Sequence, residues 1–304
     1  MLIKPIKIHI SSLGPIRDAE LEITDLMIFS GESGLGKSYL AILSHYFFEV
    51  ILSGSRLENF LKERGIYWNR VKALLVEPRG EVMMVRKSEL EEWMSRDAVD
   101  YLRYMLGNDN LTAELTVDYP DVFPEEFTIT YEKTEGAIVD NPEDLSVILE
   151  ADGIRYRTHG AEIFGEENPL SRLIGLSLCS YLTGDPLGLK CAYEMPPSRG
   201  AFLTEKVVAQ TGLYVEFQKF LDYVNRSKLI RTEPEASLLE TMDTLIEGEV
   251  KYEENKYLYQ ARDNSMPVSA AAASVRELGA IDLLVRNIPI AASALLIEEP
   301  DAHL

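Results

Sequence analysis

The sequence of 304 residues is poor in cysteine, in long apolar runs and in basic residues, and each shortage excludes a class of protein. Cys179 and Cys191 are too few for a disulfide-stabilised scaffold, so we expect reduced thiols in a cytoplasmic protein. The most apolar stretch, residues 40–52, contains His45 and Glu49 and is shorter than the about 20 residues that span a bilayer. We therefore expect a buried helix there, and neither a signal peptide nor a membrane partner.

The shortage of basic residues leaves a formal net charge of −20. An acidic surface repels the phosphate backbone, so a nucleic-acid partner is possible but is not supported by the charge. Basic residues are densest between Arg56 and Arg103, where any basic patch is expected to lie. Internal repeats, low-complexity linkers and a sustained heptad pattern are absent too, which argues against a coiled-coil arm.

The first part of the chain has the pattern of strands followed by one helix. Apolar and polar residues alternate over residues 6–10 and 19–23, which predicts an antiparallel hairpin around Gly14. Residues 26–29 form a continuous apolar run, typical of a strand covered on both faces. A helix is expected from Lys37 to about residue 51.

The later pattern predicts helices over residues 55–105 with exposed surfaces, and strands over residues 110–160. Further helices are expected over residues 170–181, 203–226, 234–246 and 270–285. Further strands are expected over residues 190–194 and 291–298, with a hairpin over 248–259. Asn255 lies at the expected turn of that hairpin.

A glycine-rich segment between the apolar run and the helix matches G-x-x-x-x-G-K-[ST] at every fixed position. Its glycines let the backbone curl so that N–H groups point at phosphate oxygens, and the helix N-terminus adds positive charge. Lys37 is expected to reach the β- and γ-phosphates, and the Ser38 hydroxyl to ligate Mg²⁺. The expected nucleotide-binding residues are Gly31, Glu32, Ser33, Gly34, Leu35, Gly36, Lys37, Ser38 and Tyr39.

The end of the sequence, residues 295–304, reads as an apolar strand followed by Glu298, Glu299 and Pro300. An NTPase needs one carboxylate on the Mg²⁺ side and a second that polarises the attacking water. The turn at Pro300 is expected to aim Glu299 at the γ-phosphate.

The two ends together resemble the ATP-binding-cassette type of ATPase found in SMC, RecF and OLD-like proteins. More narrowly, the pattern is similar to the bacterial AAA family ATPases of anti-phage defence, including a G-P-I-x-x-A-x-[IL]-x-[IL] hairpin at residues 14–23. The resemblance implies that Glu298 lies on the Mg²⁺ side, that Glu299 is the catalytic base, and that residues 301–304 begin an inter-subunit loop. His303 belongs to that loop. Lys37, which would contact the phosphates, is the second expected catalytic residue. The resemblance also implies an ATP-driven homodimer, a possible effector, and a role in phage defence or DNA maintenance.

Cassette ATPases complete their site with a serine at a helix N-terminus of the second subunit. By the resemblance, Ser274 is the candidate for this signature serine, although alanines stand where the family has a Ser-Gly pair. An alanine-rich packing helix with Ser274 as its N-cap is the alternative, and both interpretations stay open.

Arg199, in the segment Met-Pro-Pro-Ser-Arg, is expected to be a loop arginine paired with an acidic side chain at the surface.

Three further features of the family are the Mg²⁺-sensing glutamine, the switch histidine and the effector domain. None of Gln210, Gln218 and Gln260 can be placed as a Mg²⁺-sensing glutamine. In the family, a switch histidine and an effector domain lie beyond the point where this sequence stops, so we expect a shortened form that binds ATP better than it hydrolyses it.

The expected fold is α/β, of the P-loop NTPase class, with a mixed sheet carrying the phosphate loop and antiparallel N-terminal strands. The expected divisions are an N-terminal part of the ATPase head at 1–54 and an inserted helical and β-hairpin lobe at 55–247 that partly returns to the head. Residues 248–304 are expected to form the C-terminal part of the head, with the signature-like helix and the Walker B strand. The alternatives are a P-loop kinase of a small substrate and a nucleotide-binding interaction module without turnover.

Overall fold

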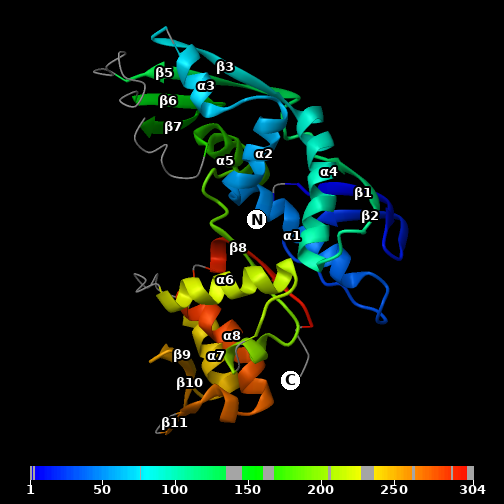
Figure 1. Ribbon diagram of the computed structural model, residues 1–304, viewed down its shortest axis with the longest axis vertical. Helices are drawn as coiled ribbons and strands as arrows, with labels where there is room; N and C mark the ends of the chain where they lie inside the picture. Colours follow the sequence, from blue (N-terminus) through cyan, green and yellow to red (C-terminus); the bar gives the residue numbers. More distant parts are fainter. Residues whose placement is uncertain are drawn as a thin grey trace. The chain divides into compact units, whose positions relative to one another are not determined.

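The computed structural model describes residues 2, 4–75, 77–134, 146–159, 168–204, 207–226, 236–261, 264–288 and 290–299. The chain divides into two compact units. The first comprises Met1–Tyr101 and Leu111–Leu189, and the second comprises Leu102–Asn110 and Lys190–Leu304. Figure 1 shows their elements, coloured along the sequence.

The first unit opens with the expected antiparallel hairpin, β1 (Ile6–Leu13) and β2 (Ile16–Ile23). Strand β4 (Ala113–Asp118) pairs with the other edge of β1 and completes a sheet in the order β2-β1-β4. The inward residues of β1 are the alternate isoleucines Ile6, Ile8 and Ile10, all buried. The alternation in the sequence therefore reflects a half-buried strand, as predicted.

Helix α1 (Lys37–Leu52) forms where it was expected and is buried along most of its length. Tyr46 of α1 donates a hydrogen bond from its hydroxyl to Asp97 at 2.9 Å, and Arg56 forms an ion pair with the same carboxylate at 2.9 Å. Four further helices belong wholly or in part to this unit: α2 (Gly54–Glu63), α3 (Trp68–Leu74), α4 (Lys87–Leu106) and α5 (Pro169–Thr183).

A second antiparallel sheet of this unit has the order β3-β5-β6-β7, and these strands lie side by side in Figure 1. Its strands are β3 (Arg79–Arg86), β5 (Glu126–Lys133), β6 (Ser146–Ala151) and β7 (Ile154–His159). Asp152 and Gly153 both have positive φ in the turn between β6 and β7. This geometry matches the right-handed twist of a tight hairpin.

The second unit contains a parallel pair of strands and a separate antiparallel sheet. Strands β8 (Cys191–Met195) and β12 (Ser293–Ile297) run parallel, with Glu194 opposite Leu296. The antiparallel sheet has the order β11-β10-β9 and consists of β9 (Glu249–Glu253), β10 (Lys256–Ala261) and β11 (Asn264–Pro267). Strands β9 and β10 pair antiparallel, which confirms the predicted hairpin, and Asn255 has a φ of 62° in its turn.

Helices pack around these strands in the second unit. They are α6 (Gly212–Arg226), α7 (Ala236–Ile246) and α8 (Ala273–Asn287), with short 3-10 helices η3 (Arg199–Leu203), η4 (Val268–Ala270) and η5 (Ile290–Ala292). Phe220 of α6 packs on Tyr193 of β8, with 5.2 Å between ring centroids. Apolar side chains from α6 and α8, including Phe217 and Leu284, form its buried core.

The structure confirms an α/β architecture, but several predicted elements are wrong. Residues 26–29 form no strand, and Leu26 and Ile28 are 78% and 81% exposed. Among the described residues, the sheets therefore include no mixed sheet that carries the phosphate loop. A strand forms only where its backbone N–H and C=O groups pair with a neighbouring strand, and residues 26–29 pair with no strand of the described sheets.

The predictions for residues 55–105 and 203–226 also need correction. Residues 79–86 form strand β3 rather than a helix, and α4 is not an exposed helix, because Leu90, Trp93 and Met94 are buried. The helix predicted over residues 203–226 begins only at Gly212, after the 3-10 helix η3.

Two expectations from the composition can also be compared with the structure. Cys179 and Cys191 are both free thiols, as predicted. Within the described ranges, no helix is both long enough and apolar enough to cross a membrane.

Candidate functional site

Residues 31–38 of the first unit, the predicted phosphate loop, have the backbone that their glycines predict. Gly31, Gly34 and Gly36 have φ values of 137°, 82° and 93°, conformations that residues with a Cβ rarely adopt. A Cβ built on Gly34 meets no atom within 4 Å, so the loop is open at this position. Gly36 is the N-cap of α1, and no side chain caps the helix. The first N–H groups of α1 have no acceptor within the helix, which is the arrangement that binds an anion.

Lys37 folds back over the loop that precedes it. Its ammonium group donates hydrogen bonds to the main-chain oxygens of Gly31 and Glu32, both at 2.8 Å. The positive charge is therefore held at the loop rather than extended into solvent. A bound phosphate could accept from the same ammonium, because Lys acts as a point charge with three donors.

The turn of the β1–β2 hairpin packs against the base of the phosphate loop. A Cβ on Gly14, whose φ is 56°, would lie 2.1 Å from the Tyr39 ring, and one on Gly36 would lie 2.8 Å from Ile16. Only glycine fits at either contact. Sequence reasoning found the hairpin motif by resemblance, but not its contact with the loop.

The remaining residues of the predicted nucleotide set lie in this loop and in the first turn of α1. Glu32, Ser33 and Leu35 are exposed, whereas Ser38 and Tyr39 are partly buried. Tyr39 is turned toward the hairpin, because its ring occupies the space next to Gly14. The nine residues are consecutive in the chain, and their role in nucleotide binding stays a prediction.

The two carboxylates predicted to act with this loop belong to the second unit. Glu298 follows β12 directly, and its N–H donates to the main-chain oxygen of Met195 at 2.9 Å, extending the parallel pairing by one residue. Glu299 is exposed and has a φ of 47°. Both carboxylates therefore lie beyond the carboxyl ends of parallel strands, where α/β proteins place ligand sites. Pro300, residues 301–304 and His303 lie outside the described residues.

Left-handed backbone occurs on both loops at this edge. Ser198, after β8, has a φ of 54°, and Glu299, after β12, has one of 47°. Such a conformation costs a residue with a Cβ about 1–3 kcal/mol and persists only where its surroundings enforce it.

The two carboxylates also influence a neighbouring tyrosine. Burial raises the pKa of Tyr214 on α6, and the negative charges of Glu299 and Glu298 raise it further.

Arg199 is not the surface arginine that we expected from the sequence. Its side chain is 1% exposed, and its guanidinium donates to the main-chain oxygens of Glu277 and Glu298, at 3.2 and 3.1 Å. The prediction was wrong because a guanidinium can be buried where main-chain carbonyls satisfy it. The Met-Pro-Pro-Ser-Arg segment was the only sequence signal for this position.

Helix α8 carries Ser274 but does not use it as a cap. The helix begins at Ala273 with Ala272 as its N-cap and no capping side chain, so Ser274 lies in the first turn. The predicted capping role of Ser274 is therefore wrong, because the helix starts too early along the chain. Its predicted phosphate-facing role stays a prediction.

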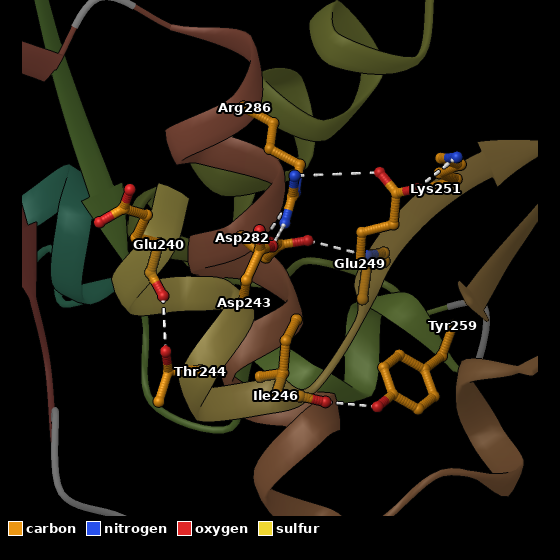
Figure 2. Close-up of polar contacts among 10 residues, drawn as sticks. Glu240, Asp243, Thr244, Ile246, Glu249, Lys251, Tyr259, Asp282 and Arg286 are labelled. Atoms are coloured by element: carbon orange, nitrogen blue, oxygen red, sulfur yellow. Dashed lines mark hydrogen bonds and ion pairs between the residues drawn. The ribbon is translucent and has the colours of Figure 1, made fainter. Parts of the chain in front are cut away.

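A buried ionic cluster anchors the other end of α8 (Figure 2). Asp282 is fully buried and accepts hydrogen bonds from Arg286 Nε and from the Val250 N–H, both at 2.8 Å. Arg286 also binds Asp243 of α7 at 2.5 Å and approaches Glu249 of β9 at 3.9 Å. The cluster ties α8 to α7 and β9.

The phosphate loop fits a nucleotide, since it offers an open main-chain cradle, an uncapped helix N-terminus and a positioned ammonium. Within the described ranges, no three His, Cys, Asp or Glu side chains gather as a ready-made metal site.

Comparison of the chain with protein-family models, with curated proteins and with solved structures finds no significant match.

Proposed function

We propose that the chain is an ATPase of the P-loop class, similar to the cassette ATPases of SMC, RecF and OLD-like proteins. The observation that carries the proposal is the loop at residues 31–38. Three glycines with positive φ lead into an uncapped helix, and the Lys37 ammonium lies over the loop. Main-chain donors, a helix N-terminus and a lysine together are the chemistry that binds the phosphates of ATP.

Hydrolysis is assigned to the carboxylates after β12. Glu298 is the Mg²⁺-side ligand together with Ser38, and Glu299 is the base that polarises the attacking water. The exposed position of Glu299 and its left-handed backbone support this assignment, because strained conformations gather at active sites.

The same proposal includes a nucleotide-dependent homodimer in which Ser274 of one copy faces the ATP of the other. The start of α8 supports it, since no side chain caps this helix and a helix N-terminus attracts a phosphate. A cytoplasmic role in phage defence or DNA maintenance, with an effector partner, follows from the motif resemblance alone.

Steady-state ATP turnover tests the proposal. We expect Glu299→Gln to lower kcat by about 100-fold or more, because it removes a general base while keeping the shape of the side chain. Glu254→Gln is a matched control, because Glu254 is also an exposed glutamate with positive φ, in the β9–β10 turn. It should leave kcat unchanged.

Other results would favour the alternatives. Transfer of phosphate to a small acceptor rather than to water would indicate a kinase. Saturable ATP binding without turnover in the wild type would indicate an interaction module. Equal loss of turnover in Glu299→Gln and Glu254→Gln would contradict the assignment of Glu299.

A further inference from the structure

Arg199 bridges two elements of the second unit that are far apart in the sequence. Its Nε donates to the main-chain oxygen of Glu277 on α8 at 3.2 Å. One terminal nitrogen donates to the oxygen of Glu298 at 3.1 Å and reaches that of Pro196 at 3.5 Å. A single buried side chain therefore joins the loop after β8, the end of β12 and the second turn of α8.

The charge of this buried guanidinium has acidic neighbours. Burial lowers the pKa of Arg199, while the negative charges of Glu277 and Glu299 oppose that effect. The planar guanidinium also provides donors in several fixed directions, whereas a lysine provides one compact ammonium. Arginine is thus the side chain that can bind both main-chain oxygens at once.

Gly200 makes the second half of the same connection. Its N–H donates to Glu277 Oε2 at 3.3 Å. A Cβ on Gly200 would lie 2.8 Å from Glu277 Oε1 and 2.9 Å from the carbonyl carbon of Arg276. The 3-10 helix η3 therefore lies directly on the backbone of α8, and the spacing between them leaves no room for a methyl group.

We propose that Arg199 is a positioning residue for hydrolysis, a role that rests on the proposed function. By holding the main-chain oxygen of Glu298, it fixes the left-handed backbone of Glu299 and so the direction of that carboxylate. By holding Glu277 as well, it couples this direction to α8. Ser274 lies on α8 three residues before Glu277, so a phosphate bound at the start of α8 acts on Glu299 through Arg199.

The test compares Arg199→Lys with Arg286→Lys. Both substitutions keep the positive charge. Arg286, on α8, is a largely buried arginine like Arg199 on η3, but its partners are the carboxylates of Asp282 and Asp243. We expect Arg199→Lys to lower kcat by about tenfold or more with KM for Mg-ATP within about twofold, because misdirecting Glu299 affects the transition state and not the phosphate loop. Arg286→Lys should lower the thermal midpoint and leave kcat and KM unchanged.

Gly200→Ala tests the same coupling if Arg199→Lys fails to fold. The added methyl group separates η3 from α8 while keeping the guanidinium, and it should lower kcat with KM retained. Hydrogen exchange adds a readout without nucleotide: either variant should exchange faster at residues 198–200, 274–278 and 298–299 than the Arg286→Lys protein.

The outcomes separate this inference from the proposed function. A wild-type chain that does not bind Mg-ATP overturns the proposed function itself. A wild-type chain that turns ATP over, with Arg199→Lys and Gly200→Ala keeping the wild-type kcat, overturns only the positioning role. Equal loss of kcat in Arg199→Lys and Arg286→Lys also overturns it, since the effect would then be general damage to α8.

Discussion

Two glycines of the first unit share a left-handed backbone but differ in what surrounds them. Gly14 has a φ of 56°, and a Cβ there would lie 2.1 Å from the Tyr39 ring; Gly65 has a φ of 72° and would meet no atom within 4 Å. A Cβ at Gly65 costs only backbone strain, whereas one at Gly14 must also displace a ring at the start of α1.

We therefore predict that Gly14→Ala weakens ATP binding and that Gly65→Ala does not. Gly65→Ala should lower the free energy of unfolding by about 1–2 kcal/mol, the cost of left-handed backbone, and Gly14→Ala by more. Chemical denaturation and nucleotide titration of both variants measure these effects. Equal ATP affinity in Gly14→Ala and the wild type would show that the hairpin turn does not support the loop.

For single residues, the sequence predicted the backbone conformation of the loop glycines but not which side chains are buried. The conformations of Gly31, Gly34 and Gly36 follow from the motif, because each position needs a residue without a Cβ. The burial of Arg199 does not follow, since its partners are main-chain oxygens and these leave no mark on the sequence. Which arginine is buried depends on how three distant segments pack.

At the scale of elements, the alternation of apolar and polar residues predicted strands that pair with a neighbour in the chain. It did not predict strands whose partners are distant in the sequence. The hairpin of β1 and β2 was predictable because its two strands are neighbours in the chain and share a period of two. The apolar run at residues 26–29 was misread, because its state depends on strands elsewhere in the chain. Strand β3 was missed for the same reason: its partner β5 begins forty residues after the end of β3, at Glu126.

The cluster around Arg286 gives a prediction about how α8 is held. Asp282 is fully buried, whereas the Asp243 side chain is 59% exposed, and both bind the same guanidinium. Asp282→Ala should lower the free energy of unfolding by about 2–3 kcal/mol, because it leaves the Val250 N–H without its acceptor and takes one carboxylate partner from Arg286. Asp243→Ala should cost at most about 1 kcal/mol. Urea denaturation of the two variants measures the difference, and similar losses would contradict this account.

Helix α4 carries a group whose protonation should be linked to stability. Burial raises the pKa of Glu91 above its ordinary value of 4.5, although the Tyr119 N–H and Lys87 oppose the shift; the charge of Asp118 adds to it. The folded state therefore binds the proton more tightly than the unfolded state does. In the window from 4.5 up to the raised value, the free energy of unfolding should fall as the pH rises.

Glu91→Gln isolates this effect, because the amide oxygen can still accept from the Tyr119 N–H, which lies 2.8 Å from the carboxylate. The stability of the wild type relative to Glu91→Gln should fall as the pH rises through the window and stay constant above it. Denaturation at a series of pH values measures the difference. A difference that grows with pH would mean that the fold favours the charged carboxylate.

For the whole molecule, the net charge of −20 opposes the association of two copies. We predict that Glu299→Gln, which should hold ATP unhydrolysed, dimerises with Mg-ATP and more strongly as salt rises from about 0.01 to 0.15 M, because salt screens repulsion between the copies. Sedimentation velocity with ADP as the control measures the dimer fraction. Dimerisation that is independent of nucleotide, or that weakens as salt rises, would contradict the proposed ATP-dependent homodimer.

The central claim is that residues 31–38 bind the phosphates of ATP, and isothermal titration of Mg-ATP tests it most directly. Lys37→Ala removes the ammonium at the loop, and Lys62→Ala is a control that removes a half-exposed lysine paired with Glu58 on α2. We predict saturable binding by the wild type and by Lys62→Ala, and affinity about tenfold weaker or worse for Lys37→Ala, the worth of a charge-assisted contact. No binding by the wild type, or equal binding by all three, would contradict the account.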